Sequence, residues 1–202
     1  MRQVVLATRN AHKVFELRHI LADVCDELGL DIIGADVFPN APDVVEDGVT
    51  FEENARLKAV ALAKTTGLPA LADDSGLAVD VLGGAPGIFS ARWAGSHGND
   101  RANLELLLDQ LADVKDEHRG AAFVCAAVMA LPDGTVRAPE GRMPGTLARE
   151  PKGTNGFGYD PILIVEGDTR HSAELTPEEK NAISHRGKAF RAMVPHLREL
   201  FG

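Results

Sequence analysis

Two adjacent aspartates, Asp73 and Asp74, are the residues whose type and position point most directly to chemistry. They follow the apolar segment 68–72, which is typical of a buried strand, and precede Ser75 and Gly76. Neighbouring side chains of a strand point to opposite faces, so one carboxylate is expected to face a site. It could hold Mg²⁺ or accept a proton from an attacking water. An acidic turn, in which one aspartate caps a backbone amide, is the alternative.

A polar turn near the N-terminus has the composition of an anion site. It lies between the apolar segment 4–7 and a helical repeat, and consists of Thr8, Arg9, Asn10, Ala11, His12 and Lys13. The first N–H groups of a helix lack partners within it, and the helix dipole favours an anion beside them. The turn is therefore a candidate phosphate site, although it lacks the Gly-rich P-loop pattern. A simple turn with Asn10 as helix cap is the alternative.

An acidic run, residues 43–47, comes before a helix predicted to begin near Phe51 with Thr50 as its cap. Its Glu46 could supply a second metal ligand, although such runs are commonly solvated surface. Lys58 lies on the predicted helix, where a single lysine is most often exposed.

The segment 153–161 combines glycines, which let the backbone approach a ligand, with two aromatic rings that can stack on a flat base. Within it the candidate binding residues are Phe157, Gly158, Tyr159 and Asp160. The alternative is a long turn with aromatic anchors. Downstream, Lys180, His185 and Arg186 bring positive charge to a helix start, where the dipole prefers negative charge, so we expect an anion or polar ligand there. A surface histidine is the alternative for His185.

Strands and helices alternate along the chain, which predicts an α/β fold with a mixed sheet and helices on its faces. Strands are expected at 4–7, 30–35, 68–72, 77–82, 121–131 and 162–165, with a hairpin strand at 135–138. Further helices are expected from Asp100, from Thr176, whose Pro177 and Glu179 complete a helix start, and from Ser184. Residues 139–161 are rich in glycine and proline, most densely in the segment GTNGFGYDP, and no strand or helix is predicted there.

Composition limits the classes of partner. The net charge of −9 over 202 residues argues against a nucleic-acid polymer, because polymer binders usually carry a basic face. Cys25 and Cys125 have no metal or redox spacing and are expected to be free buried thiols. No apolar run approaches the roughly 20 residues of a membrane helix, and the first ten residues lack the apolar core of a signal peptide. A cytoplasmic location without membrane attachment is the expectation.

These segments, in this order, resemble the non-canonical purine nucleoside triphosphate pyrophosphatase family, which includes inosine triphosphatase and dITP/XTP pyrophosphatase. The blocks that carry the resemblance are VVLATRNAHKVFEL, TFEENARLKA, ADDSGLAVDVLGGAPGIFSARW, GTNGFGYDPI and AELTPEEKNAISHRGKA. The resemblance implies one domain over residues 1–202, elongated, with a long central mixed sheet and a cleft between two lobes. It also implies Mg²⁺, a homodimer, and cleavage between the α- and β-phosphates of ITP, dITP and XTP.

Site residues are carried over from the family motif by motif. The resemblance implies that Thr8 to Lys13 hold the triphosphate, helped by Lys58 and Lys180. Asp74 would bind Mg²⁺ and accept the proton, and Ser75 would touch the substrate. The base would be held by Phe157 to Asp160, beside His185 and Arg186.

Two positions depart from the family pattern. Arg9 stands where the family often has glycine, and Val45 stands at the place of an acidic metal ligand. Glu46 is the nearest carboxylate to that place and is the candidate second ligand. Two other functions stay open: a non-catalytic nucleotide sensor, and a house-cleaning pyrophosphatase for modified pyrimidine nucleotides.

Overall fold

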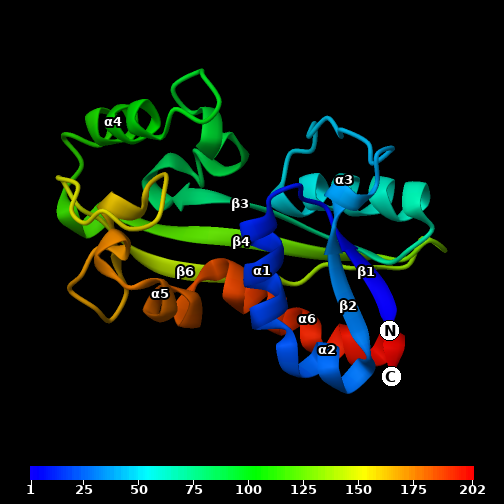
Figure 1. The fold of residues 1–202 in the computed structure, drawn as a ribbon. Helices are drawn as coiled ribbons and strands as arrows, with labels where there is room; N and C mark the ends of the chain where they lie inside the picture. Colours follow the sequence, from blue (N-terminus) through cyan, green and yellow to red (C-terminus); the bar gives the residue numbers. More distant parts are fainter. The chain divides into compact units, whose positions relative to one another are not determined.

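The computed structural model describes residues 1–202 apart from His12, and it confirms an α/β fold with a central mixed sheet flanked by helices (Figure 1). The strands are β1 (Arg2–Leu6), β2 (Leu30–Gly34), β3 (Ala70–Val79), β4 (Gly120–Ala130), β5 (Val136–Arg137), β6 (Glu140–Leu147) and β7 (Leu163–Val165). The α-helices are α1 (Ala11–Ile20), α2 (Ala22–Leu28), α3 (Phe51–Thr66), α4 (Asp100–Gln110), α5 (Pro177–Ile183) and α6 (His185–Phe201).

The sheet combines parallel and antiparallel pairs. Within the described residues its strand order is β2-β1-β3-β4-β6-β7, and β5 pairs with β4. β1 runs parallel to both β2 and β3, whereas β5 is antiparallel to β4 and β7 is antiparallel to β6. The β4–β5 pair is the hairpin predicted around residues 132–134.

The chain divides into two compact units, each assembled from separate stretches of sequence. Unit 1 comprises Met1–Asp74, Cys125–Gly141 and Arg186–Gly202, and unit 2 comprises Ser75–Val124 and Arg142–His185. The expectation of one domain over the whole chain stays a prediction.

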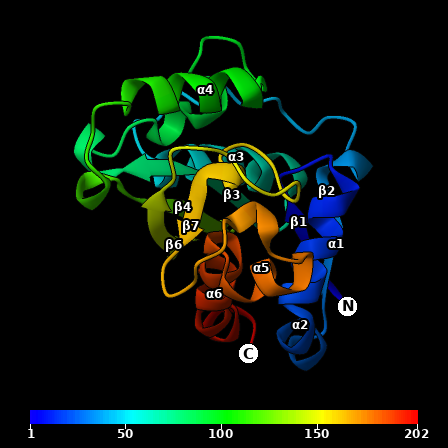
Figure 2. The same cartoon turned by 90° about the vertical axis from the view of Figure 1, so that its left-hand side faces the viewer.

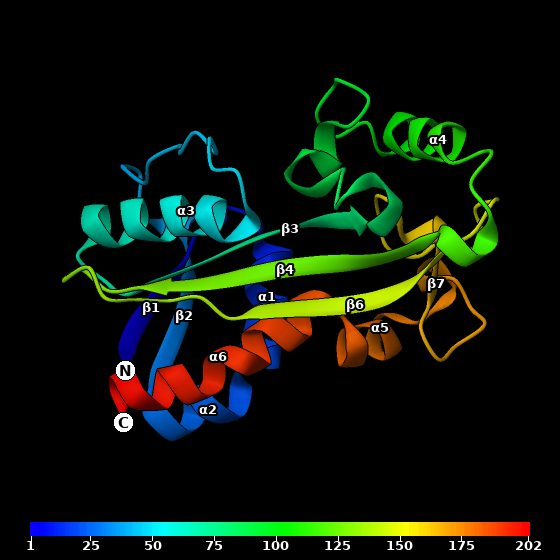
Figure 3. The same ribbon diagram turned by 180° about the vertical axis from the view of Figure 1, so that it is seen from behind.

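Unit 1 has helices on both faces of its strands because alternate strand residues enter different cores. Val4 and Leu6 of β1 pack with residues of α1, α2 and α6, such as Phe190. Val5, between them, packs with residues of α3, such as Leu62. Figures 1 and 3 show α3 on one side of these strands and α2 and α6 on the other. Helix α3 therefore packs against one face of β3, and helix α6 packs against the other.

Unit 2 has its own core. Leu77 and Val79 of β3 pack with Leu107 of α4, Phe123 of β4 and Met143 of β6. Figure 2 shows α4 on one side of the strands of this unit and α5 on the other. The unit therefore has its own apolar framework around the segment 153–161.

Two predicted boundaries in the sheet were wrong. β3 is continuous from Ala70 to Val79, where two strands separated by a turn at 73–76 were expected. Asp73 and Asp74 do not end the strand, because their carboxylates find partners on its two faces. β6 lies in the Gly- and Pro-rich segment 139–161, where no strand was predicted. Its Gly145 is required there, since a Cβ would lie 2.1 Å from the carbonyl oxygen of Ile164 on β7.

The helix termini agree with the sequence signals, with one difference. Thr50 Oγ1 accepts a hydrogen bond from Glu53 N, but the Glu53 carboxylate accepts from Val49 N, so the capping box is incomplete. Thr176 and Glu179 form a complete capping box at α5. Helix α6 continues through Pro195 to Phe201.

The two cysteines are free, as predicted; Cys125 is buried and Cys25 only half-buried. Across the part of the chain that is described, no helix combines the length and the apolar character needed to cross a membrane.

Candidate functional site

The two aspartates of β3 point to opposite faces of the strand, as the pleat requires. Asp73 Oδ2 accepts hydrogen bonds from Nε and Nη2 of Arg186 at 3.1 and 3.0 Å. Asp74 Oδ2 accepts from Asn54 Nδ2 at 3.1 Å. Arg186 belongs to α6 and Asn54 to α3, the helices on opposite faces of unit 1. The carboxylates of Asp73 and Asp74 therefore lie in two different environments.

Asp74 lies in a cluster of two carboxylates and one ammonium. Lys58 Nζ lies 3.3 Å from Glu46 Oε1 and 4.0 Å from Asp74 Oδ1. The side chains of Lys58 and Asp74 are only 19% and 17% exposed. Asn54 and Lys58 are four residues apart on α3 and so lie on one face of the helix. The capped start of α3 therefore positions Asn54 and Lys58 beside Asp74.

On the other face, Asp73 belongs to a buried charge network. Arg186 Nη1 also lies 3.4 Å from Glu16 Oε2 of α1. Burial raises the pKa of the Asp73 carboxyl, but the positive charges of Arg186, Lys13 and Lys58 outweigh burial and hold that pKa below its usual value. The charge of Asp73 in turn raises the pKa of Arg186. Arg186, predicted to bind substrate, is thus bonded to an internal carboxylate, which offsets its charge at the start of α6.

The predicted phosphate turn follows β1 directly. Asn10 N donates to Thr8 Oγ1 at 3.1 Å, and Ala11 is the first residue of α1. Lys13 lies close enough for its charge to lower the pKa of Asp73. His12 lies outside the described residues.

The Arg9 side chain contacts residues outside this turn. Its guanidinium donates to Asp43 Oδ1 at 3.0 Å and to the carbonyl oxygen of Ala41 at 3.2 Å. It therefore joins the turn to the acidic loop. Beside it lies a pocket of about 360 Å³, whose lining includes the predicted residues Thr8, Arg9, Glu46 and Lys58.

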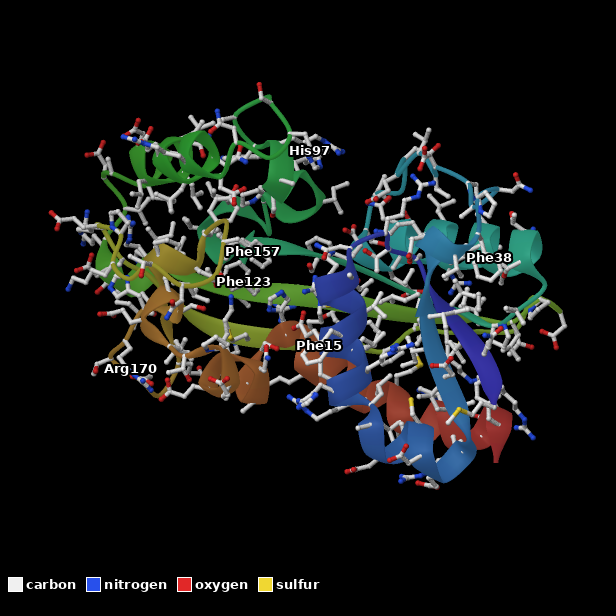
Figure 4. The ribbon with its side chains drawn as sticks, viewed as in Figure 1. Phe15, Phe38, His97, Phe123, Phe157 and Arg170 are labelled. Atoms are coloured by element: carbon white, nitrogen blue, oxygen red, sulfur yellow. The ribbon has the colours of Figure 1, made fainter. Side chains whose placement is uncertain are left out.

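Unit 2 contains a second, smaller pocket of about 110 Å³. Every predicted site residue that belongs to this unit lines it: Ser75, Phe157, Gly158, Tyr159, Asp160, Lys180 and His185. Phe123 of β4 also lines it and stacks on the His185 ring, with ring centroids 5.2 Å apart. Phe123 and Phe157 are labelled in Figure 4. The pocket offers aromatic faces beside a few polar groups, which is typical of small-molecule sites.

Hydrogen bonds made by two buried side chains fix the loop 157–160 beside this pocket. Tyr159 is buried, and its hydroxyl donates to the carbonyl oxygen of Ser90 at 2.8 Å. Asp160 is only 2% exposed, and its carboxylate accepts from Ser172 Oγ, Phe157 N and Lys180 Nζ. Phe157, by contrast, is 66% exposed. Of the two predicted stacking rings, Tyr159 is therefore anchored in the core and Phe157 is the exposed one.

Sequence reasoning missed three polar or aromatic groups that lie next to predicted residues. Asn54 had a usable signal, because it stands four residues before Lys58 on the same predicted helix. Ser172 and Phe123 had none: Ser172 begins a short 3₁₀ helix, Ser172–Glu174, that no sequence pattern predicted, and Phe123 is one apolar residue within a long apolar run.

Comparisons with known proteins agree with this architecture. The model of the Ham1 family matches residues 4–196. A protein of Streptomyces coelicolor named dITP/XTP pyrophosphatase is 69% identical over 202 residues, covering all of both chains. A HAM1 protein structure from Coxiella burnetii has a TM-score of 0.90 at 43% identity, covering 98% of this chain and 100% of that one. A dITP/XTP pyrophosphatase structure from Mycobacterium abscessus has a TM-score of 0.81 at 50% identity, covering 96% and 99%. The resemblance drawn from the motifs is confirmed, and the chain belongs to the Ham1 family.

Proposed function

We propose that this chain is a nucleoside-triphosphate pyrophosphatase that hydrolyses ITP, dITP and XTP to the monophosphate and pyrophosphate, and so clears them from the nucleotide pool. The observation that carries the proposal is the convergence of Asp74 and Glu46 on the ammonium of Lys58. The names of the relatives support the same reaction.

The donors of unit 1 fit Mg²⁺. Asp74 and Glu46 offer hard oxygen ligands, and Mg²⁺ is commonly held by one or two carboxylates, several waters and substrate phosphates. Among the described residues, no group of three or more His, Cys, Asp or Glu side chains is placed to hold a metal ion. Asp74 and Glu46 would hold the ion, which when bound neutralises phosphate oxygens and activates water.

The residues around this cluster would divide the work of hydrolysis. Asp74 accepts the proton of the attacking water, and Asn54 fixes the orientation of its carboxylate by donating to Oδ2. Lys58 and the turn from Thr8 to Lys13 provide the positive charge and N–H groups that stabilise charge on the leaving pyrophosphate. No covalent intermediate is required.

The pocket of unit 2 would take the base. Phe157 provides an exposed ring for stacking, and His185 provides a polar ring held against Phe123. Hypoxanthine and xanthine carry an acceptor at position 6, where adenine carries a donor. Donors from His185, Arg186 or the 157–160 backbone would favour the keto form, and such discrimination is large because the wrong base leaves buried groups unpaired.

Other properties belong to the same proposal. The family resemblance supports a homodimer and a single catalytic domain. A cytoplasmic location is part of the same proposal. The net charge of −9 supports small nucleotides as partners and argues against nucleic-acid polymers.

One assay separates this function from its alternatives. Phosphate is measured with malachite green, with and without added inorganic pyrophosphatase, across ITP, XTP, GTP, dUTP and ATP. We expect phosphate from ITP and XTP only when the added enzyme is present, with Asp74→Asn as the inactive control. Binding without release would indicate a sensor, and preference for dUTP would indicate a pyrimidine enzyme.

A further inference from the structure

Lys180 contacts two residues of one loop at the same time. Its Nζ donates to Asp160 Oδ2 and lies 5.3 Å from the centroid of the Phe157 ring. The Lys180 side chain is only 15% exposed. An ammonium over an aromatic face is attracted by the ring, and more strongly when partly desolvated. Lys180, on α5, therefore ties together both ends of the tetrapeptide 157–160.

Asp160 requires this partner. Its side chain is 2% exposed, and a buried carboxylate is stable only when it is paired and hydrogen-bonded. Ser172 Oγ and Phe157 N supply two hydrogen bonds, at 2.7 and 2.8 Å, but Lys180 supplies the cation. A Lys180 side chain that turned away to bind phosphate would leave this carboxylate buried without its positive charge.

The backbone at Gly156 lies close to the ion pair of Lys180 and Asp160. Gly156 has a φ of 78°, a conformation that other residues rarely adopt. A Cβ at Gly156 would lie 2.1 Å from Asp160 Oδ2 and 3.0 Å from Lys180 Nζ. The backbone therefore passes directly over the ion pair, where a side chain has no room.

We propose that Lys180 is a positioning residue, which holds Phe157 beside the base pocket through Asp160 and the ring, and that it is not a ligand of the triphosphate. This inference rests on the proposed function only in naming the base as what Phe157 contacts. It replaces the phosphate-binding role that the family resemblance implied for Lys180.

The two roles predict different losses in Lys180→Met, which removes the charge and keeps the side-chain length. Isothermal titration calorimetry would measure binding of inosine, which carries no phosphate, and of a non-hydrolysable α,β-imido analogue of ITP. If Lys180 positions Phe157, both ligands weaken by a similar factor, on the order of tenfold for loss of one stacking contact. If Lys180 binds phosphate, the analogue weakens and inosine does not, which would overturn the proposal.

A second readout does not need any nucleotide. Amide hydrogen exchange in the ligand-free protein would follow the Phe157 N–H, which donates to Asp160. Lys180→Met should speed its exchange, and Ser172→Ala, which removes another donor to the same carboxylate, should do so too. Lys152→Met, an exposed lysine near the same loop, should not. Unchanged exchange in Lys180→Met would contradict the proposal.

The outcomes also separate this inference from the proposed function. If the wild-type protein binds no inosine nucleotide, the proposed function fails, while exchange at Phe157 still decides the role of Lys180. If Lys180→Met does not fold, Lys180→Gln, which also removes the charge but keeps a polar side chain, provides the test through both readouts. Equal weakening of the two ligands, with faster Phe157 exchange, would support the inference in that variant.

Discussion

Removing one partner of the buried pair of Arg186 and Asp73 should cost far more stability than removing one partner of an exposed pair of the same chemistry. The two side chains are 14% and 12% exposed, and removing one partner of a buried pair typically costs about 3–5 kcal/mol. Lys13 and Lys58 still act on Asp73 when Arg186 is replaced. We therefore expect Arg186→Met to lower the free energy of unfolding by about 3 kcal/mol, the lower end of that range.

A matched control lies on the surface of the same unit. Arg198 donates to both carboxylate oxygens of Glu27, at 2.8 to 3.1 Å, but the two side chains are 54% and 47% exposed. Exposed pairs are weakened by solvent and by side-chain entropy, so Arg198→Met should change the unfolding free energy little. Urea unfolding followed by far-UV circular dichroism would measure both variants. Equal losses would refute the argument from burial.

The difference caused by Arg186→Met should also depend on pH. The folded pKa of Asp73 lies below its ordinary 3.8, so the wild-type protein gains stability above that pH and loses it as the pH falls through the folded pKa. Without Arg186, burial disfavours the ionised carboxylate, and protonation relieves the penalty. The gap between wild type and variant should therefore narrow as the pH approaches 4. A gap that is constant with pH would contradict this assignment.

Three further predictions concern activity. Asp74→Asn should lower kcat by roughly 10²–10⁴-fold, as for loss of a general base, with an unchanged circular dichroism spectrum; near-normal turnover would exclude Asp74 as the base. Asn54→Ala should lower kcat more than it raises KM, because Asn54 orients the Asp74 carboxylate. Steady-state kinetics with ITP would measure both constants, and an effect on KM alone would contradict this role of Asn54. EDTA should abolish turnover and added Mg²⁺ should restore it, whereas activity that persists in EDTA would argue against the metal.

Much of the fold follows from local sequence signals. Caps at Thr50 and Thr176 and the continuous apolar run of β1 specify elements without reference to the rest of the chain. The continuity of β3 through Asp73 and Asp74 was not predictable in this way. Carboxylates within a strand look like a turn until their partners, Arg186 and Asn54, are known, and those partners lie far away in the sequence.

The sequence predicted the types of residue in the candidate site, but it did not predict which other side chains those residues contact. The residues of segments 8–13, 157–160 and 180–186 have the chemistry that a nucleotide requires, and the family motifs point to the same positions. Their partners depend on packing: Arg9 is joined to Asp43 and Lys180 to Asp160. A positive side chain in a sequence predicts an available charge, but a nearby carboxylate in the folded chain decides how that charge is used.

The products of hydrolysis show which phosphoanhydride bond the protein cleaves. Phosphorus-31 NMR of dITP incubated with the protein and Mg²⁺ would identify every phosphorus-containing product in a single spectrum. The proposed reaction predicts equal amounts of dIMP and pyrophosphate, with no dIDP at any time. Appearance of dIDP and inorganic phosphate would place cleavage between the β- and γ-phosphates and contradict the proposed reaction.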